Sequence, residues 1–124
     1  MNSAKKKPYL QQKKSSDLAN GVIKVHKDGY YEVCFYVDGV RHGFVEYYYT
    51  CGQLGIRGNY KNGKEHGLWE SFSFFGKNKL ECKGHFKNGK KDGIWEYYDI
   101  QDGQLINLEY FINGKEVRAK DIPS

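Results

Sequence analysis

The sequence predicts an all-β fold: an elongated, single-layer antiparallel meander of tandem β-hairpin repeats. The first observation is one motif written twice, as GNYKNGKEHGLWE at 58–70 and as GHFKNGKKDGIWE at 84–96, with a weaker copy, CFYVDGVRHGFVE, at 34–46 and a partial one, EYFINGKEV, at 109–117. The second is that every copy centres on Asp-Gly or Asn-Gly between alternating residues, the strongest short-range hairpin signal. The third is composition. The 124 residues include 11 Tyr, 7 Phe and 15 Gly but only 2 Pro, which excludes collagen and argues against a disordered chain.

Residues 1–20 are predicted to be a basic, flexible N-terminal tail. Five lysines and one acid give this segment +4 of the chain's net charge of +5, so the remainder is nearly neutral. A nucleic-acid-binding domain would concentrate positive charge on its folded part, so no nucleic-acid partner is expected. Three roles stay open for the tail: a solubilising extension, a weak anchor for anionic lipid worth about 1 kcal/mol per lysine, and, in a eukaryotic source, a nuclear-import signal.

Residues 21–118 form the predicted repeat domain, followed by a C-terminal tail at 119–124. The turn glycines are spaced by 24, 26 and 25 residues, and they are Gly39, Gly63, Gly89 and Gly114. The repeats therefore fall near 30–57, 58–83 and 84–108, with a partial one at 109–118. Looser turns between them give about eight or nine short strands joined consecutively. No segment of this region has a helical apolar period.

The two-residue turn at Asn62-Gly63 fixes the predicted register of the second repeat. Lys61 faces Lys64, Tyr60 faces Glu65, and Gly58 faces Gly67. The third repeat pairs Gly84 with Gly93 in the same way, and parity places both tryptophans on the glycine face. Large rings can cover the slot that glycines leave. The residues given structural roles are Gly58, Gly63, Gly67, Trp69, Gly84, Gly89, Gly93 and Trp95.

The first repeat departs from this pattern at two positions. Cys34 stands where the later copies have glycine, and Val45 stands where they have tryptophan. A smaller side chain over a larger one conserves volume, so this repeat is predicted to be an N-terminal capping variant.

The tandem pattern G-x-[YF]-x-N-G-K-x-x-G-x-W-E at 58–70 and 84–96 resembles the MORN-repeat variant of bacterial YwqK-type antitoxins. The resemblance covers roughly residues 30–118 and implies MORN-like β-hairpin repeats. It also implies an antitoxin or immunity protein, often encoded beside a toxin, that neutralises the toxin by direct binding. It implies no catalytic residues, because the shared positions are turn and packing residues. Other proteins with related repeats act as scaffolds or lie near membranes, so a scaffold or membrane-associated protein tethered by the basic tail is the alternative.

The face opposite the tryptophans carries the residues predicted to contact a partner. Acids and aromatics at equivalent repeat positions predict a surface for a basic protein, the alternative being a solvated face whose aromatics favour strand formation. The acids do not suit the paired carboxylates of a glycosidase, because equivalent residues on neighbouring repeats form a flat row without a pocket that would separate the acid from the base. A non-enzymatic binding module is therefore expected. The predicted contacts are Glu46, Glu70, Glu96, Tyr48, Phe72 and Tyr98.

The histidines predict no metal site. His42 and His66 occupy equivalent positions, but the third repeat has Asp92 there. The register places His66 opposite Asn59 and His85 opposite Asp92, as ordinary cross-strand polar pairs. No cofactor is expected.

The three cysteines have neither metal-ligand spacing nor a nucleophile signature. Cys34 is expected on the packed face, and Cys51 in an exposed turn. An odd number of cysteines, without a secretory signal or an apolar span, predicts a reduced cytoplasmic protein. Edge strands starting at Val22 or Glu109 could pair between chains, so self-association is the remaining expectation.

Overall fold

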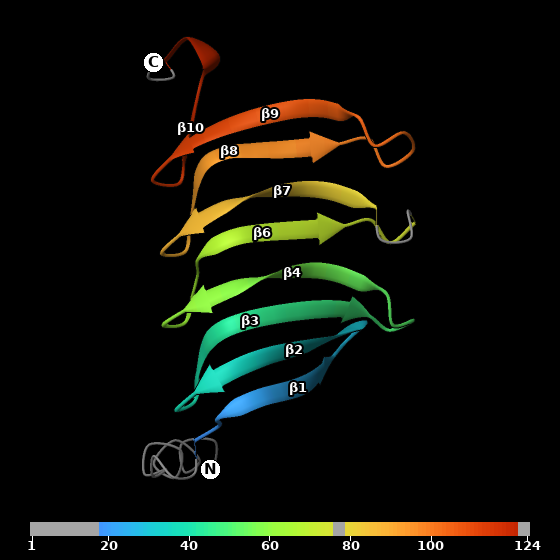
Figure 1. Cartoon of the computed structure of the whole chain (residues 1–124), viewed down its shortest axis with the longest axis vertical. Coiled ribbons are helices and arrows are strands. Elements are labelled where there is room, and N and C mark those ends of the chain that lie inside the picture. The colour runs from blue at the N-terminus through green and yellow to red at the C-terminus, as the bar shows by residue number, and fades with distance from the viewer. Residues whose placement is uncertain (1–17, 76–78, 122–124) are drawn as a thin grey trace, which may run out of the picture.

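The computed structural model describes residues 18–75 and 79–121, and these form one open antiparallel sheet of ten strands in meander order (Figure 1). The predicted all-β, single-layer meander is confirmed. A short 3-10 helix, Ala119–Asp121, follows the last strand. The strands are β1 (Gly21–Lys27), β2 (Tyr30–Val37), β3 (Val40–Tyr49), β4 (Leu54–Lys61), β5 (Lys64–Glu65), β6 (Gly67–Phe72), β7 (Leu80–Lys87), β8 (Lys90–Tyr98), β9 (Leu105–Ile112) and β10 (Lys115–Val117).

The four hairpin turns stack along one side of the sheet (Figure 1). Their first residues are Asp38, Asn62, Asn88 and Asn113, with φ between 49° and 51°, and each precedes a glycine of positive φ, the geometry of a type I′ turn. The turns also join the repeats. The N–H of Gly63 donates to the carbonyl of Arg41 at 2.8 Å, and the N–H of Gly89 donates to the carbonyl of Glu65 at 2.8 Å.

The predicted register holds beside the turns and fails further along each hairpin. Tyr60 pairs with Glu65 as expected, but Arg57 pairs with Glu70. Between these two pairs, the chain that follows the turn therefore has two more residues than the strand before the turn. The third repeat shifts in the same way between Lys83 and His85. The predicted pairs of Gly58 with Gly67 and of Gly84 with Gly93 are therefore wrong.

The physical reason for the shift is backbone geometry at the second glycine of each predicted pair. Gly67 has a φ of +81° and Gly93 a φ of +80°, values outside the strand region. Each marks a bulge, in which extra residues on one strand oppose fewer on its partner. Nothing lies within 4 Å of a Cβ placed on either glycine, so neither is covered by a ring.

The core face is built around a row of side chains that crosses the sheet from strand to strand. Trp69 pairs with Gly84 in β7, and Trp95 pairs with Glu109 in β9. Each tryptophan ring lies over the glycine of its own hairpin. A Cβ placed on Gly58 would lie 2.2 Å from the ring of Trp69, and one on Gly84 would lie 2.1 Å from that of Trp95. The glycines thus make room for the two rings, which are almost fully buried: Trp69 is 8% exposed and Trp95 is 5% exposed.

Neighbouring aromatic rings and a lysine shield the two tryptophans from solvent, as a second layer of structure does in thicker folds. Trp69 lies edge-on between Tyr60 and Phe86, with centroids 5.4 and 5.7 Å away, and Phe86 meets Trp95 at 5.1 Å. The Nζ of Lys91 lies 4.6 Å from the centroid of Trp95, within range of a cation–π contact. The first repeat fills the same row with Cys34 opposite Val45, both fully buried.

The N-terminal boundary of the repeat domain lies earlier than predicted. Leu18, Ala19 and Asn20, assigned to the tail, contact the first hairpin turn. The carbonyl of Ala19 accepts from the N–H of Gly39 at 2.8 Å, and Oδ1 of Asn20 accepts from the N–H of Asp38 at 2.9 Å. The remainder of the predicted tail, 1–17, and the last residues, 122–124, lie outside the described residues.

These contacts identify an additional half repeat. LANGVIK at 18–24 aligns with VRHGFVE at 40–46, and Gly21 has the positive φ, +92°, of the later bulge glycines. His42 repeats the role of Asn20, because its Nδ1 accepts from the N–H of Asn62 at 3.1 Å. The signal was a glycine followed by two apolar residues, obscured by the missing tryptophan and by the lysines upstream.

Candidate functional site

The outer face, opposite the tryptophans, carries a row of charges that crosses five strands. Its members are Glu46, Arg57, Glu70, Lys83 and Glu96, each paired with the next in the sheet register, and this row is called the charge ladder below. Nε of Arg57 lies 2.7 Å from Oε1 of Glu70, and Nζ of Lys83 lies 3.7 Å from Oε1 of Glu96. Glu70 thus stands between two bases, and Glu46 and Glu96 end the row with one basic neighbour each, so the row offers alternating charge rather than an acidic field.

Both predicted tyrosines are hydrogen-bonded to the acid two residues before them. The hydroxyl of Tyr48 donates to Oε1 of Glu46 at 2.9 Å, and that of Tyr98 donates to Oε1 of Glu96 at 2.7 Å. Burial and the bond to Glu46 raise the pKa of Tyr48, and the bond to Glu96 raises the pKa of Tyr98. Both hydroxyls are therefore held in place as donors.

Phe72 differs from the two tyrosines in exposure. Its ring is 9% exposed and lies under the guanidinium of Arg57, whose Cζ is 5.3 Å from the ring centroid. Because phenylalanine has no hydroxyl, Glu70 is bonded by Arg57 instead. Phe72 packs beneath the Arg57 side chain and, unlike Tyr48 and Tyr98, exposes little surface that a partner could contact.

Beside the charge ladder runs an apolar stripe that the sequence reasoning missed. Its members occupy the equivalent position just before the core residue of each repeat, and they are 57%, 38%, 42% and 55% exposed: Val22, Phe44, Leu68 and Ile94. Successive members lie two strands apart, which corresponds to about 9.5 Å. The signal was present in G-x-W-E, where x is always apolar although strand alternation directs it to solvent.

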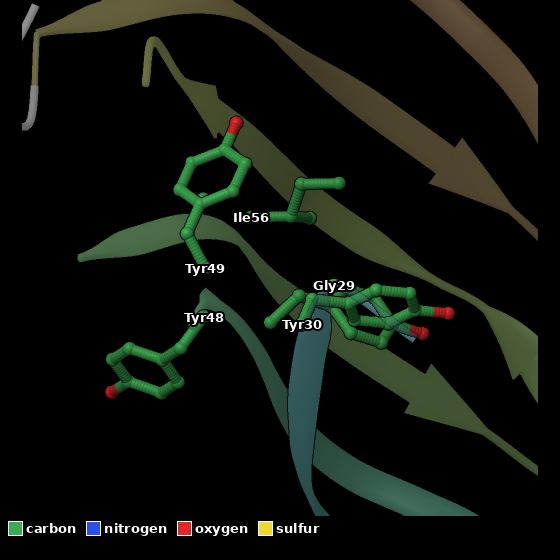
Figure 2. A pocket seen from close by; sticks show the side chains of 7 residues that line it. Gly29, Tyr30, Tyr48, Tyr49 and Ile56 are labelled. Atoms are coloured by element: carbon green, nitrogen blue, oxygen red, sulfur yellow. The ribbon is translucent and has the colours of Figure 1, made fainter. Parts of the chain in front are cut away.

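A shallow cavity of about 320 Å³ lies at the ends of β1–β4 (Figure 2). Its lining is almost entirely aromatic or glycine: Gly29, Tyr30, Tyr47, Tyr48, Tyr49, Gly55 and Ile56. The ring of Tyr49 covers Gly55, where a Cβ would lie 3.1 Å from Cε2, and Tyr30 meets Tyr47 edge-on at 5.9 Å. These walls offer packing but no cluster of convergent charges.

The first repeat also contains a buried ion pair on the core face. Glu32 is 1% exposed and accepts from Nε and Nη2 of Arg41, both at 2.9 Å. The bond to Glu32 raises the pKa of Arg41, and Cζ of Arg41 lies 5.5 Å from the centroid of Tyr60. Because carboxylate and guanidinium satisfy one another, this pair is a structural element and not a free acid and base.

The cysteines and histidines form no reactive group in the described residues. Cys34 is buried, Cys51 is exposed, and burial raises the pKa of the Cys34 thiol. Among residues 18–75 and 79–121, no three side chains of the metal-binding types come together. The same residues contain no helix long and apolar enough to cross a membrane.

No protein-family model matches the chain, and no curated protein does. Two solved structures show weak similarity. One is the crystal structure of TarM, with a TM-score of 0.40 and 14% identity over 94% of this chain and 24% of that one. The other is a mutant of S. aureus TarM in complex with Fondaparinux, α-GlcNAc-glycerol and UDP, with a TM-score of 0.41 and 14% identity over 93% and 23%. The chain therefore spans about a quarter of the length of these proteins.

Proposed function

We propose that this chain is a non-enzymatic protein-binding module that holds its partner on the outer face. The observation that carries the proposal is the apolar stripe, in which Val22, Phe44, Leu68 and Ile94 repeat one exposed position across the sheet. On the core face the aromatic rings cover one another. The residues between them on the same face are polar, with Asn59 opposite Phe44 and His85 opposite Leu68, so the stripe is a row of separate apolar anchors in a polar surround, an arrangement found in protein interfaces.

The apolar stripe and the charge ladder have different roles in the proposed binding. The apolar stripe supplies area that is removed from water, and its regular spacing suits an elongated partner with apolar groups about 9.5 Å apart. The charge ladder beside it supplies alternating partners that fix position and orientation. Tyr48 and Tyr98, whose hydroxyls donate to the two end acids of the ladder, Glu46 and Glu96, offer the remaining polar contacts.

In its finer form the proposal is an antitoxin or immunity protein of the cytoplasm that neutralises a toxin by covering its active surface. Support for this comes from the tandem motif at 58–70 and 84–96, which resembles the MORN-repeat variant of YwqK-type antitoxins. The alternative is a structural scaffold or membrane-associated protein that uses residues 1–20 as a tether. Binding to anionic vesicles that disappears on removal of residues 1–20 would favour the alternative.

The deciding experiment is a pull-down from the native host with the tagged protein and three variants. Leu68→Asp/Ile94→Asp removes the centre of the apolar stripe, and Glu70→Lys/Glu96→Lys reverses the ladder. Asp28→Lys/Glu116→Lys makes the same change of charge at exposed residues outside the outer face. We expect one protein partner with the parent and the control, and none with Leu68→Asp/Ile94→Asp. Retention by both outer-face variants, with unchanged circular dichroism, would overturn the proposal.

A further inference from the structure

We propose that strand β1 is a docking edge for an extended acidic segment of another protein, which adds to the sheet as a further antiparallel strand. On one side β1 pairs with β2 along its whole length, from Gly21 opposite Tyr36 to Lys27 opposite Tyr30. In residues 18–75 and 79–121, no strand lies on its other side, and β1 is the outermost strand in Figure 1. The site is an edge of backbone groups, so it is separate from the outer-face function proposed above and does not depend on it.

The open edge of β1 is regular, which suits it to pairing. The pairs between β1 and β2 follow one another without a register shift, whereas β2–β3, β3–β4, β6–β7, β7–β8 and β8–β9 each contain one. Lys27 faces Tyr30 across a two-residue turn, so its N–H and C=O point toward β2. Alternation without a bulge then directs the same groups of Val22, Lys24 and His26 to the open side. These three are the residues whose backbone groups a new strand would bond.

The charges along β1 select the chemistry of the partner. Lys24, His26 and Lys27 have exposed side chains, and β1 contains no acid. The Nζ of Lys24 lies 4.3 Å from the ring centroid of Tyr31, which keeps its charge on the outer face beside the open edge. An acidic side chain opposite Lys24 would form a cross-strand pair of opposite charge, and such pairs stabilise antiparallel strands.

The core-face side chains of β1 favour apolar partners. Ile23 and Val25 lie on the face of the tryptophans, opposite Cys34 and Glu32, and both are only half-buried. Glu32 is already bonded by Arg41, so it offers no free charge at this edge. Apolar residues opposite Ile23 and Val25 would cover them and add buried apolar area to the backbone bonds. The partner segment therefore alternates acidic residues on the outer face with apolar residues on the core face.

The same charges disfavour two occupants that this chain itself could supply. A second copy that paired through its own β1 would bring Lys24 and Lys27 of both chains to one junction, where like charges are destabilising. Residues 1–17 contain five lysines and one acid, so they would add positive charge to a basic edge. An acidic segment of another protein has the complementary charge, and addition of an extended peptide to a sheet edge is a recurring mode of recognition.

Binding of a synthetic peptide to the full chain tests the edge. The acidic peptide is Ac-Ser-Glu-Val-Glu-Val-Thr-NH2, with Glu opposite Lys24 and His26, and the control peptide has Lys in place of both Glu. In the free protein, NMR is expected to show rapid amide hydrogen exchange at Val22, Lys24 and His26, slowed at least tenfold by the acidic peptide. The amides between them bond β2 and should exchange slowly in both states. Slow exchange at Lys24 in the free protein would show an edge already covered by residues 1–17 or a second copy, and would overturn the proposal. Absence of saturable binding at about 1 mM acidic peptide, or equal binding of the control peptide, would also overturn it.

Substitutions at Lys24 separate the backbone from the charge. Lys24→Pro removes the outward N–H but no bond to β2, a change that edge strands tolerate, and should weaken binding of the acidic peptide at least tenfold. Lys24→Val keeps the N–H and removes the charge, so its loss should be smaller, about threefold. Lys24→Glu reverses the charge on an unchanged backbone, should abolish the preference for the acidic peptide, and decides the matter if Lys24→Pro fails to fold by circular dichroism. Lys115→Glu, the same reversal in β10, is the matched control and should bind like the parent. Parental affinity in Lys24→Glu, or in folded Lys24→Pro, would refute docking at β1.

Discussion

Trp95 and Gly84 face each other within one hairpin, and the indole ring occupies the space that any side chain at Gly84 would need. A Cβ there would lie 2.1 Å from Cδ2 of Trp95, closer than non-bonded carbon atoms approach. The ring is fixed further by its Nε1, which donates to the carbonyl of His85 at 3.1 Å. Trp69 has the same relation to Gly58, with Nε1 donating to the carbonyl of Asn59 at 3.0 Å. The fold therefore depends on glycine and tryptophan as a pair.

The first prediction is that Trp95→Ala lowers the free energy of unfolding by about 3–5 kcal/mol. This is the usual cost of truncating a buried tryptophan, and the ring at Trp95 is 5% exposed. Urea unfolding followed by far-UV circular dichroism measures the change. A loss below about 1 kcal/mol would contradict the view that the ring over Gly84 carries the core.

The second prediction concerns coupling within this pair. Gly84→Ala should destabilise the parent strongly, because the added methyl group displaces the ring. In the Trp95→Ala background the same change should cost much less, since the space is then empty. The double-mutant cycle gives a coupling free energy of about 1–3 kcal/mol if the two residues interact as described. Additive effects of the two substitutions would show that they act independently.

The third prediction exchanges one version of the core pair for the other. Cys34 and Val45 are fully buried opposite each other where later repeats have glycine and tryptophan. Val45→Trp alone should destabilise the fold by about 1–3 kcal/mol through overpacking. Adding Cys34→Gly should recover much of that loss by restoring the slot. If thermal unfolding shows the double variant to be less stable than Val45→Trp, the two pairs are not equivalent.

The sequence predicts the sheet and its turns because their causes are local. Asn-Gly and Asp-Gly set the turns, and alternation sets which residues share a face. The bulges at Gly67 and Gly93 were not predictable from alternation, since two extra residues preserve parity while shifting every later pair. The predicted facing of Gly58 with Gly67 failed for this reason, although Trp69 lies on the expected face.

The outer face was only half predictable, because its neighbours come from other strands. Glu70 was recognised by its repeat position, whereas its pairing with Arg57 depends on the register beyond the bulge. Phe72 was expected to stand beside the acids, and its burial under Arg57 likewise depends on that register. The half repeat at 18–24 was concealed because Ile23 replaces the tryptophan that marks the other copies.

The fourth prediction concerns the buried ion pair. Arg41→Ala leaves the carboxylate of Glu32, which is 1% exposed, without its partner. We expect a loss of about 2–3 kcal/mol, below the range for fully buried pairs because the Arg41 side chain is 36% exposed. Glu32→Gln/Arg41→Met should be more stable than Arg41→Ala, since no unpaired charge remains. Equal stability of these two variants in urea would show that the charge of Glu32 is not the cause.

The fifth prediction is a loss of stability in alkali. Burial is the main cause that raises the pKa of Tyr47 and of Tyr97 above the ordinary tyrosine value of 10.0, helped by hydrogen bonds to Tyr60 and to Glu109 respectively. Above pH 10 the unfolded chain loses protons that the folded chain keeps, so the folded state binds more protons. The free energy of unfolding therefore falls as pH rises above 10 toward the folded values.

Urea unfolding at pH 8 and pH 10.5 measures this slope. Tyr97→Phe removes one of the groups, so its stability should fall less between the two values than that of the parent, even if it is less stable at pH 8. Ile94→Val, a conservative change in β8 at an exposed side chain that carries no titratable group, is the control and should keep the parent's slope. Equal slopes for the parent and Tyr97→Phe would mean that this hydroxyl ionises as readily in the folded chain as in water, against its bond to Glu109 at 2.6 Å.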